Sequence, residues 1–164
     1  MENSQNLCGV GMSRHFISKR DLKKIRPRVE SLHIDFTDIT RLEVESRGRM
    51  TIYYFEKRPF FFEAERLIPT LFLLNAVNPN GKRVTVDDGA VPHIIKGSDI
   101  FIRGITEVDP DIVPGDMVYV GNQKGTFIAV GVASEPSEKL LSNSTGMGIR
   151  TLHYLNDRIM RESV

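Results

Sequence analysis

Short runs of strand-forming residues separated by glycines fill the second half of the chain. They span residues 84–86, 100–102, 117–120, 127–132 and 149–155. Many short strands with glycine turns are typical of a small β-barrel. Between the first two runs, residues 89–96 carry apolar side chains, with Pro92 where a first helical turn tolerates proline and Gly97 at the end. We predict one helix there that crosses or plugs the barrel.

The first half opens with a helix signal. Ser18 fits an N-cap, Asp21 fits the capping-box position, and Pro27 fits a stop. We therefore predict a short helix that runs through Ile25.

An alternation of apolar and polar residues follows between residues 31 and 62, and it predicts a small antiparallel sheet. Arg47-Gly48-Arg49 fits a hairpin turn between two of its strands. Pro69 suits the first position of a second helix, which the turn signature at residues 78–81 ends.

We place a domain boundary after this second helix. The predicted fold class is α+β, with a small N-terminal α+β domain over residues 1–79 and a C-terminal β-barrel domain over residues 80–164. In the second domain, residues 135–141 predict a further short turn of helix. Residues 156–158 lead into a polar C-terminal tail.

The composition, with 40% hydrophobic and 26% charged residues, indicates a globular protein. Cys8 is the lone cysteine of the sequence, which excludes an internal disulfide and a zinc cluster of thiolates. The apolar stretch at residues 67–77 is shorter than the ~20 residues that cross a bilayer, and Pro69 interrupts it. The first residues lack the features of a secretory signal. We expect a cytoplasmic protein with no membrane partner.

Enzyme motifs are absent from the sequence. It contains no phosphate-binding loop, no nucleophile elbow and no histidine or cysteine spacing typical of a metal site. Asp87 and Asp88 are adjacent, so in a strand their carboxylates would face opposite sides. The four histidines have no nucleophile or ligand at a recognisable spacing, which favours structural or surface roles. We predict a non-enzyme with no catalytic residue, no metal and no cofactor.

Positive charge gathers near the start of the chain, although the net charge is only +1. On a helix, Lys19, Lys23 and Arg26 would share a face. Such a patch either contacts an anionic partner or is an ordinary solvated helix face, and the pattern leaves both open. The patch consists of Arg14, Lys19, Arg20, Lys23, Lys24, Arg26 and Arg28, opposed by Asp21.

The glycine-rich half carries a specific series of motifs. Val86-Asp87-Asp88-Gly89-Ala90-Val91 is followed by Ile94, Lys96-Gly97-Ser98-Asp99 and Arg103-Gly104-Ile105. Then come Gly115-Asp116-Met117-Val118-Tyr119-Val120, Ala129-Val130-Gly131-Val132-Ala133 and Gly146-Met147-Gly148-Ile149. In this order the motifs closely resemble a PUA domain, named after pseudouridine synthase and archaeosine transglycosylase.

The ending His153-Tyr154-Leu155-Asn156-Asp157 narrows the resemblance to the malignant-T-cell-amplified-sequence and ligatin group and its archaeal counterparts. In that group a small α+β pre-PUA domain precedes the PUA domain. The basic opening and Ile68-Pro69-Thr70-Leu71 are similar to that first domain. The chain departs from the group at its end, where Ile159-Met160 stands in place of the tryptophan often seen in relatives.

The resemblance implies binding of a structured RNA, such as the acceptor end of a tRNA, or of rRNA. It places the RNA surface at the Asp88-Gly89-Ala90 turn, the following helix and the strand leading to Arg103. Glycine backbone can approach phosphates closely, and Lys and Arg side chains add charge without reading a base sequence. The complete set of predicted RNA-binding residues is Lys82, Arg83, Asp88, Gly89, Ala90, Lys96, Gly97 and Arg103, together with Arg14, Lys19, Lys23 and Lys24.

We therefore expect a non-catalytic RNA-binding protein that acts in translation on tRNA or rRNA, with the small ribosomal subunit and a protein as candidate partners. Two alternatives stay open. The chain could be a separately encoded RNA-binding subunit of a tRNA- or rRNA-modifying enzyme of the pseudouridine synthase or archaeosine transglycosylase type. It could also be a protein-interaction scaffold that has lost RNA binding, because its second half is slightly acidic.

Overall fold

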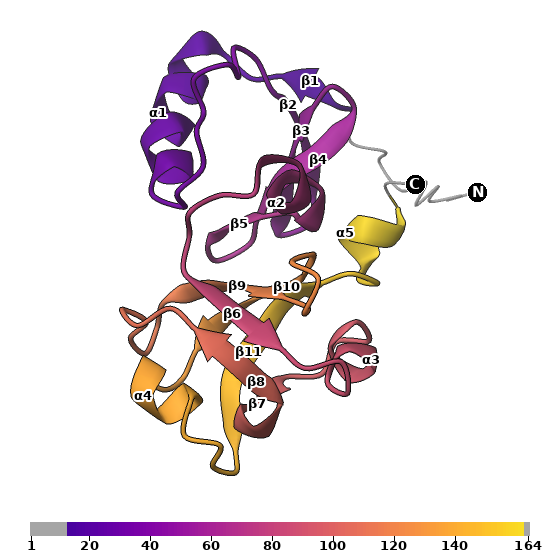
Figure 1. Cartoon of the computed structure of the whole chain (residues 1–164). Helices are drawn as coiled ribbons and strands as arrows, with labels where there is room; N and C mark the ends of the chain where they lie inside the picture. The colour runs from indigo at the N-terminus through magenta and orange to yellow at the C-terminus, as the bar shows by residue number, and fades with distance from the viewer. Residues whose placement is uncertain (1–12, 163–164) are drawn as a thin grey trace, which may run out of the picture.

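The computed structural model describes residues 13–162, which form two β-sheets with short helices around them (Figure 1). The expectation about the Cys8 thiol lies outside the described residues. Within the described range, no helix is long and apolar enough to cross a membrane.

The first sheet is antiparallel, and its strands follow one another in chain order. Its hairpin turn is confirmed at Arg47-Gly48-Arg49, because Arg47 pairs with Met50 and Gly48 takes a φ of +62°. Two helices, α1 (Lys19–Glu30) and α2 (Leu71–Val77), accompany this sheet. The strands are β1 (His15–Phe16), β2 (Glu43–Arg47), β3 (Met50–Phe55), β4 (Arg58–Glu63) and β5 (Leu67–Pro69).

Helix α1 continues through Pro27, so the predicted stop there is wrong. The Ser18 N-cap is confirmed, with its hydroxyl accepting a hydrogen bond from the Asp21 N–H at 3.1 Å. Proline removes one N–H from the ladder, yet the Pro27 carbonyl still accepts from the Ser31 N–H at 3.1 Å. The apolar stripe extends to Val29, which is fully buried. Burial of Val29 offsets the lost hydrogen bond.

The alternating residues at 32–36 do not form a strand, contrary to prediction. Ile34 and Phe36 are buried in the core, but their backbone runs as an irregular segment between α1 and β2. The alternation of apolar and polar residues in this segment therefore reflects which side chains are buried and not the pairing of a strand. Pro69 also differs from prediction, since it ends β5 and Thr70 is the N-cap of α2, with its hydroxyl accepting from the Leu73 N–H at 3.3 Å.

The second sheet has the strand order β7-β11-β10-β9-β6-β8 and is antiparallel except for the parallel pair β6 and β9. Strands β7 and β8 lie at opposite edges, but only the 3₁₀ turn η1 (Ile102–Gly104) separates them in the chain. The sheet must therefore curl until its edges approach, as the predicted barrel requires. The strands are β6 (Arg83–Val86), β7 (Ile100–Phe101), β8 (Ile105–Val108), β9 (Met117–Gly121), β10 (Phe127–Ala133) and β11 (Met147–Tyr154).

Strand β8 was not predicted, while the short helix near residue 137 is confirmed as α4 (Ser137–Leu140). The helix predicted to cross or plug the barrel is α3 (Val91–Ile94). It lies beside the strands, with Ile94 buried in the core of this half (Figure 1).

Where residues 156–158 were predicted to lead into a polar tail, the chain forms helix α5 (Arg158–Arg161). Ile159 and Met160 are buried and join the hydrophobic core of the first sheet, as do Tyr119 and Phe127 from the second. Apolar positions within the polar run explain the difference, because they need a surface that local sequence does not show. The boundary after residue 79 stays a prediction, since one core takes in residues from both halves.

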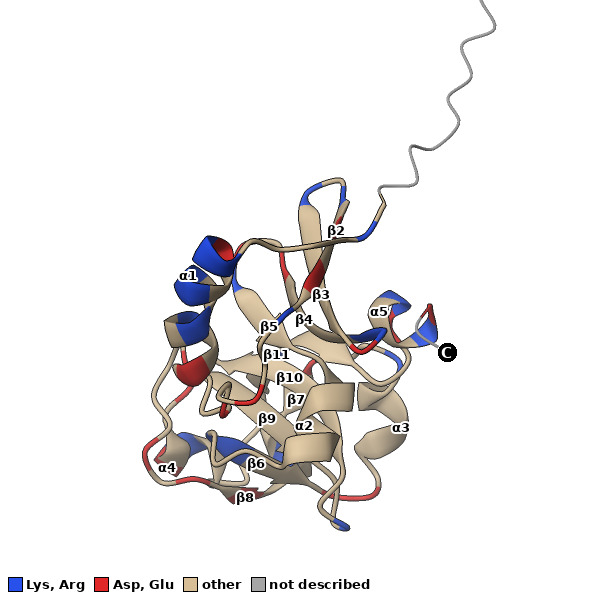
Figure 2. Ribbon diagram, turned by 90° about the horizontal axis from the view of Figure 1, so that it is seen from above, with Lys and Arg blue, Asp and Glu red and all other residues tan. Residues whose placement is uncertain are grey.

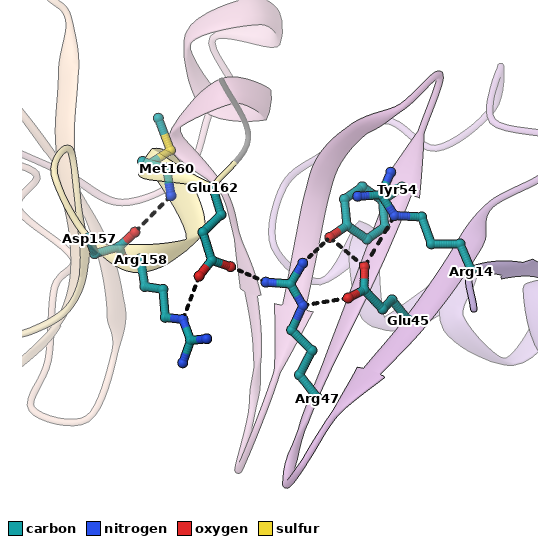
Figure 3. Close-up of polar contacts among 8 residues, drawn as sticks. All are labelled: Arg14, Glu45, Arg47, Tyr54, Asp157, Arg158, Met160 and Glu162. Atoms are coloured by element: carbon teal, nitrogen blue, oxygen red, sulfur yellow. Dashed lines mark hydrogen bonds and ion pairs between the residues drawn. The ribbon is translucent and has the colours of Figure 1, made fainter. Parts of the chain in front are cut away.

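A chain of alternating charges ties α5 to the first sheet (Figure 3). Glu45 accepts hydrogen bonds from Arg47 at 2.5 Å and from Arg14 at 3.1 Å. Arg47 also pairs with Glu162, which pairs with Arg158 at 2.6 Å. The two halves of the molecule are thus joined by ion pairs as well as by apolar packing.

Candidate nucleic-acid interface

A pocket of about 520 Å³ opens beside α3, where the turn after β6 meets the segment from β7 to η1. Gly89, Ala90 and Arg103, which were predicted to bind RNA, all line it. The full lining consists of Asp87, Gly89, Ala90, His93, Ile94, Ser98, Asp99, Ile100, Phe101, Arg103 and Gly104.

Local hydrogen bonds build the turn on one side of this pocket. The Asp87 side chain accepts from the Ala90 N–H at 2.8 Å, while the Asp87 N–H donates to the Gly104 carbonyl at 2.8 Å. Small residues let the two walls approach, since a Cβ on Gly104 would lie 3.0 Å from the Ala90 Cβ. At Gly89 a Cβ would meet only the Asp87 Oδ1, at 3.4 Å, so this position faces open space.

The opposite wall presents a ring and a free cation. Phe101 is 58% exposed, a high value for a phenylalanine. Arg103 is exposed and makes no ion pair or hydrogen bond with any described residue through its side chain. An exposed ring beside a guanidinium is suited to stack an unpaired base and to bind a phosphate. Phe101 was not among the predicted RNA-binding residues, and its only signal in the sequence was a large apolar residue in a short predicted strand.

The other predicted residues of the second half lie outside this lining. Asp88, Lys96 and Gly97 flank it in the chain, and Gly97 has the left-handed φ of +101° expected after a helix. The Lys82 ammonium is paired with Asp116 at 2.5 Å, and this hydrogen bond raises the pKa of Lys82. The Arg83 guanidinium donates to the Asn78 side chain at 2.9 Å and to the Pro79 carbonyl.

The basic patch of the first half is only partly free. Arg14 and Lys24 pair with Glu45 and Asp21, at 3.1 and 3.7 Å respectively. Lys19 and Lys23 are exposed and have no ion pair within residues 13–162. Helix α1 therefore presents a cationic surface, visible as the blue turns in Figure 2.

The two predicted RNA surfaces do not form one face. In both views of the molecule, α1 lies on one side and α3 on the other (Figures 1 and 2). An RNA that touched both would have to extend across the molecule. Among the described residues, no group of three or more His, Cys, Asp or Glu side chains could hold a metal ion.

Each half of the chain matches a known protein-family model. Residues 82–155 match the family model described as the PUA domain, and residues 13–76 match a domain of unknown function, DUF1947. A solved structure of a conserved PUA domain protein from Thermoplasma acidophilum is 40% identical, with a TM-score of 0.84, and covers 93% of this chain and all of that one. The chain belongs to the PUA-domain proteins that carry DUF1947. The PUA domain is thus the half that contains the pocket beside α3.

Other relatives extend the likeness of this PUA-domain protein. An uncharacterized protein of Methanocaldococcus jannaschii is 32% identical and covers 89% of this chain and 94% of its own length. Translation machinery-associated protein 20 of Saccharomyces cerevisiae is 26% identical, and the match covers 89% of this chain and 86% of that protein. A malignant T-cell-amplified sequence 1 homolog of Drosophila melanogaster is 28% identical, and the match covers 57% of this chain and 54% of that protein. The predicted resemblance to that group is confirmed.

Proposed function

We propose that this protein is a non-catalytic RNA-binding protein of the translation machinery, which binds tRNA at its acceptor end or rRNA through its PUA domain. The observation that carries the proposal is the pocket beside α3, where the open Gly89-Ala90 turn faces the exposed Phe101 ring and the unpaired Arg103. The PUA domain and the relatives named as translation machinery-associated support RNA binding as the general activity.

The pocket suits an unpaired nucleotide rather than a duplex. A base stacks on Phe101, a contribution of about 1–3 kcal/mol per base in single-strand binding. Arg103 binds the adjoining phosphate, and Lys96, which flanks the lining in the chain, adds a second positive charge. The absence of a side chain at Gly89 leaves room for the RNA backbone. Both contacts tolerate any base, so shape and strand ends select the RNA.

The experiment that tests this proposal places a charged side chain in the open turn. Gly89→Glu adds bulk and negative charge at the wall of the pocket, and Gly89 is outside the left-handed region, so the backbone accepts the change. We expect tRNA affinity to fall at least about tenfold, or about 1.4 kcal/mol. The thermal melt followed by circular dichroism should stay close to that of the wild type.

The matched control is Lys139→Gln, which changes the net charge by the same amount. Lys139 lies on α4, on the other side of the PUA domain from α3 (Figure 1), and its exposed pair with Glu135 at 3.4 Å contributes little. Equal tRNA affinity in Gly89→Glu and the control would contradict the proposed site. Gly131→Ala is unsuitable as a control, because its Cβ would lie 2.4 Å from the Ile149 Cγ2.

Two further measurements separate this function from its alternatives. Mass spectrometry of tRNA incubated with the pure protein should show no new modification or cleavage, and a product would contradict the non-catalytic role. Co-purification from its own cells should yield ribosomal subunits. Recovery of a modifying enzyme instead would support the subunit role, and recovery of protein without RNA would support the scaffold role.

A further inference from the structure

A second polar pocket, of about 310 Å³, lies where the two halves of the molecule meet. Three parts of the chain enclose it: the loop after α1, the turn between β4 and β5, and the segments around β6 and β9. Its lining consists of Ser31, Leu32, His33, Arg66, Gly81, Lys82, Gly115, Asp116, Met117 and Tyr119. We call this site the inter-domain cleft.

The lining of the inter-domain cleft has two basic side chains, Arg66 and Lys82, and one carboxylate. Arg66 and His33 are exposed, and neither side chain makes a hydrogen bond or ion pair with any residue between 13 and 162. Asp116 is the one carboxylate in the lining, and it already accepts from Lys82 at 2.5 Å and from the Val113 N–H at 2.9 Å. The charge of Arg66 is therefore left without a counter-charge in the cleft.

The walls of the inter-domain cleft are held in place. The Tyr119 hydroxyl donates to the Leu32 carbonyl at 2.6 Å, which joins the two halves across the floor. Gly81 packs against the Tyr119 ring so closely that a Cβ would lie 2.2 Å from the ring carbon Cε2. His33 is fixed at a φ of +62°, with its N–H donating to the Glu30 carbonyl at 2.9 Å. His33 thus stands on a left-handed backbone that a local hydrogen bond holds.

We infer that the inter-domain cleft is an anion site that binds a phosphate group, supplied by the RNA backbone. An arginine guanidinium binds phosphate with two parallel N–H donors, and an imidazole N–H adds a third. RNA is favoured as the source because its backbone carries many phosphates, and the unpaired Lys19 and Lys23 on α1, the helix that precedes His33, would bind others. This inference rests on the proposed function, and it adds a contact on the α1 side of the molecule.

The test compares Arg66→Gln with Arg49→Gln in tRNA binding across a range of salt concentrations. Arg49 is also exposed and unpaired within the described part of the chain, but it lies at the β2–β3 turn and outside the cleft lining. Loss of one phosphate contact should lower the slope of log affinity against log salt by roughly 0.7–0.9. Arg66→Gln should show this drop and Arg49→Gln should not. Equal slopes in the two variants would overturn the inference.

A second arm uses inorganic phosphate as the probe and NMR as the readout. At constant ionic strength, replacing chloride by phosphate should shift the Arg66 and His33 side-chain signals and leave the Arg49 signals unchanged. His33→Asn, which keeps a residue that tolerates the left-handed backbone, should weaken the response. An unchanged spectrum at Arg66 and His33 would overturn the inference.

The two arms keep this inference separate from the proposed function. If the wild type binds neither tRNA nor rRNA, the proposed function falls, and so does the RNA backbone as the source of the phosphate. A cleft-specific response to inorganic phosphate in that protein would still support the anion site. If the wild type binds tRNA and Arg66→Gln behaves like Arg49→Gln, only the inter-domain cleft is removed from the RNA surface.

Discussion

Single positions in the PUA domain show how one residue type serves opposite purposes. At Gly89 a Cβ would meet open space, whereas at Gly131 it would lie 2.4 Å from the Ile149 Cγ2 and 2.7 Å from the Arg150 carbonyl oxygen. The first glycine leaves the lining of the pocket beside α3 open, and the second allows β10 and β11 to pack. Both stand in glycine-rich motifs, so only the three-dimensional neighbours distinguish them.

This contrast predicts that Gly131→Ala destabilises the protein without touching the pocket. Overpacking a tight site costs about 1–3 kcal/mol, and here backbone must move. Urea unfolding should show the loss. Gly121→Ala is the matched control in the neighbouring strand, where the nearest contact of a Cβ would be an ordinary 3.6 Å to the Thr126 carbonyl. Similar unfolding free energies for the two variants would show that β10 and β11 can separate at no cost.

Among single residues, Phe101 gives the clearest functional prediction. Because its side chain is 58% exposed, Phe101→Ala should leave the unfolding free energy nearly unchanged. The loss of base stacking should weaken tRNA binding by about 1–3 kcal/mol, roughly 5- to 150-fold. Val113→Ala, also 53% exposed but outside the pocket lining, is the control for apolar surface in general. Fluorescence anisotropy that ranks the two variants alike would remove Phe101 from the site.

Among the described elements, the turn between β3 and β4 places two consecutive non-glycine residues in the left-handed region. Glu56 and Lys57 both have positive φ, at +47° and +69°, as a type I′ hairpin turn requires. Neither is a residue that this turn favours. The sequence alternation predicts the two strands but gives no sign of how the chain reverses between them.

We predict that replacing this turn by Asn-Gly, through Glu56→Asn and Lys57→Gly, stabilises the protein by about 1 kcal/mol, because Asn and Gly tolerate the left-handed region. Thermal and urea unfolding measure the gain. The same kind of change should have the opposite sign in a helix, so Lys139→Gly in α4 should cost about 1 kcal/mol. If the double variant were less stable than the wild type, the inference that this turn is strained would be wrong.

Helix α1 carries the second prediction among the elements. Lys19 and Lys23 are unpaired within the described chain, so Lys19→Glu with Lys23→Glu should remove two phosphate contacts and lower the salt slope by roughly 1.4–1.8. The control reverses Arg49 and Lys57 instead, which changes the net charge equally. An effect of equal size in both double variants would show that only the overall charge matters and that α1 is a solvated face.

For the whole molecule, the sequence predicts the parts better than their assembly. Glycine spacing and strand-forming runs identify five of the PUA strands, α3 and α4, because turns and local patterns are short-range properties. Helix α5 could not be predicted, since Ile159 and Met160 are buried in a hydrophobic core built mostly from residues of the first half of the chain. The pocket beside α3 is also predicted only in part: the sequence indicates Gly89, Ala90 and Arg103 but not the exposed ring of Phe101.

The chain of ion pairs in Figure 3 should make the stability of the protein depend on pH in the acidic range. The hydrogen bond from Arg47, helped by those from Arg14 and Tyr54, outweighs burial and lowers the pKa of Glu45 from 4.5 to about 2. A carboxylate with a lowered pKa contributes stability that is fully present above its unfolded pKa and is lost as pH falls through the folded one. The stability that Glu45 contributes should therefore decline between about pH 4.5 and pH 2.

The last prediction isolates this contribution with Glu45→Gln. The variant keeps the shape of the side chain but cannot titrate, so its unfolding free energy should start lower at neutral pH and fall less steeply between pH 4.5 and pH 2. Glu65→Gln is the control, because Glu65 is exposed and makes no ion pair with any of residues 13–162. Urea unfolding at several pH values gives both curves. Parallel curves for the wild type and Glu45→Gln would show that the charge chain between the first sheet and α5 does not set the acid stability of the protein.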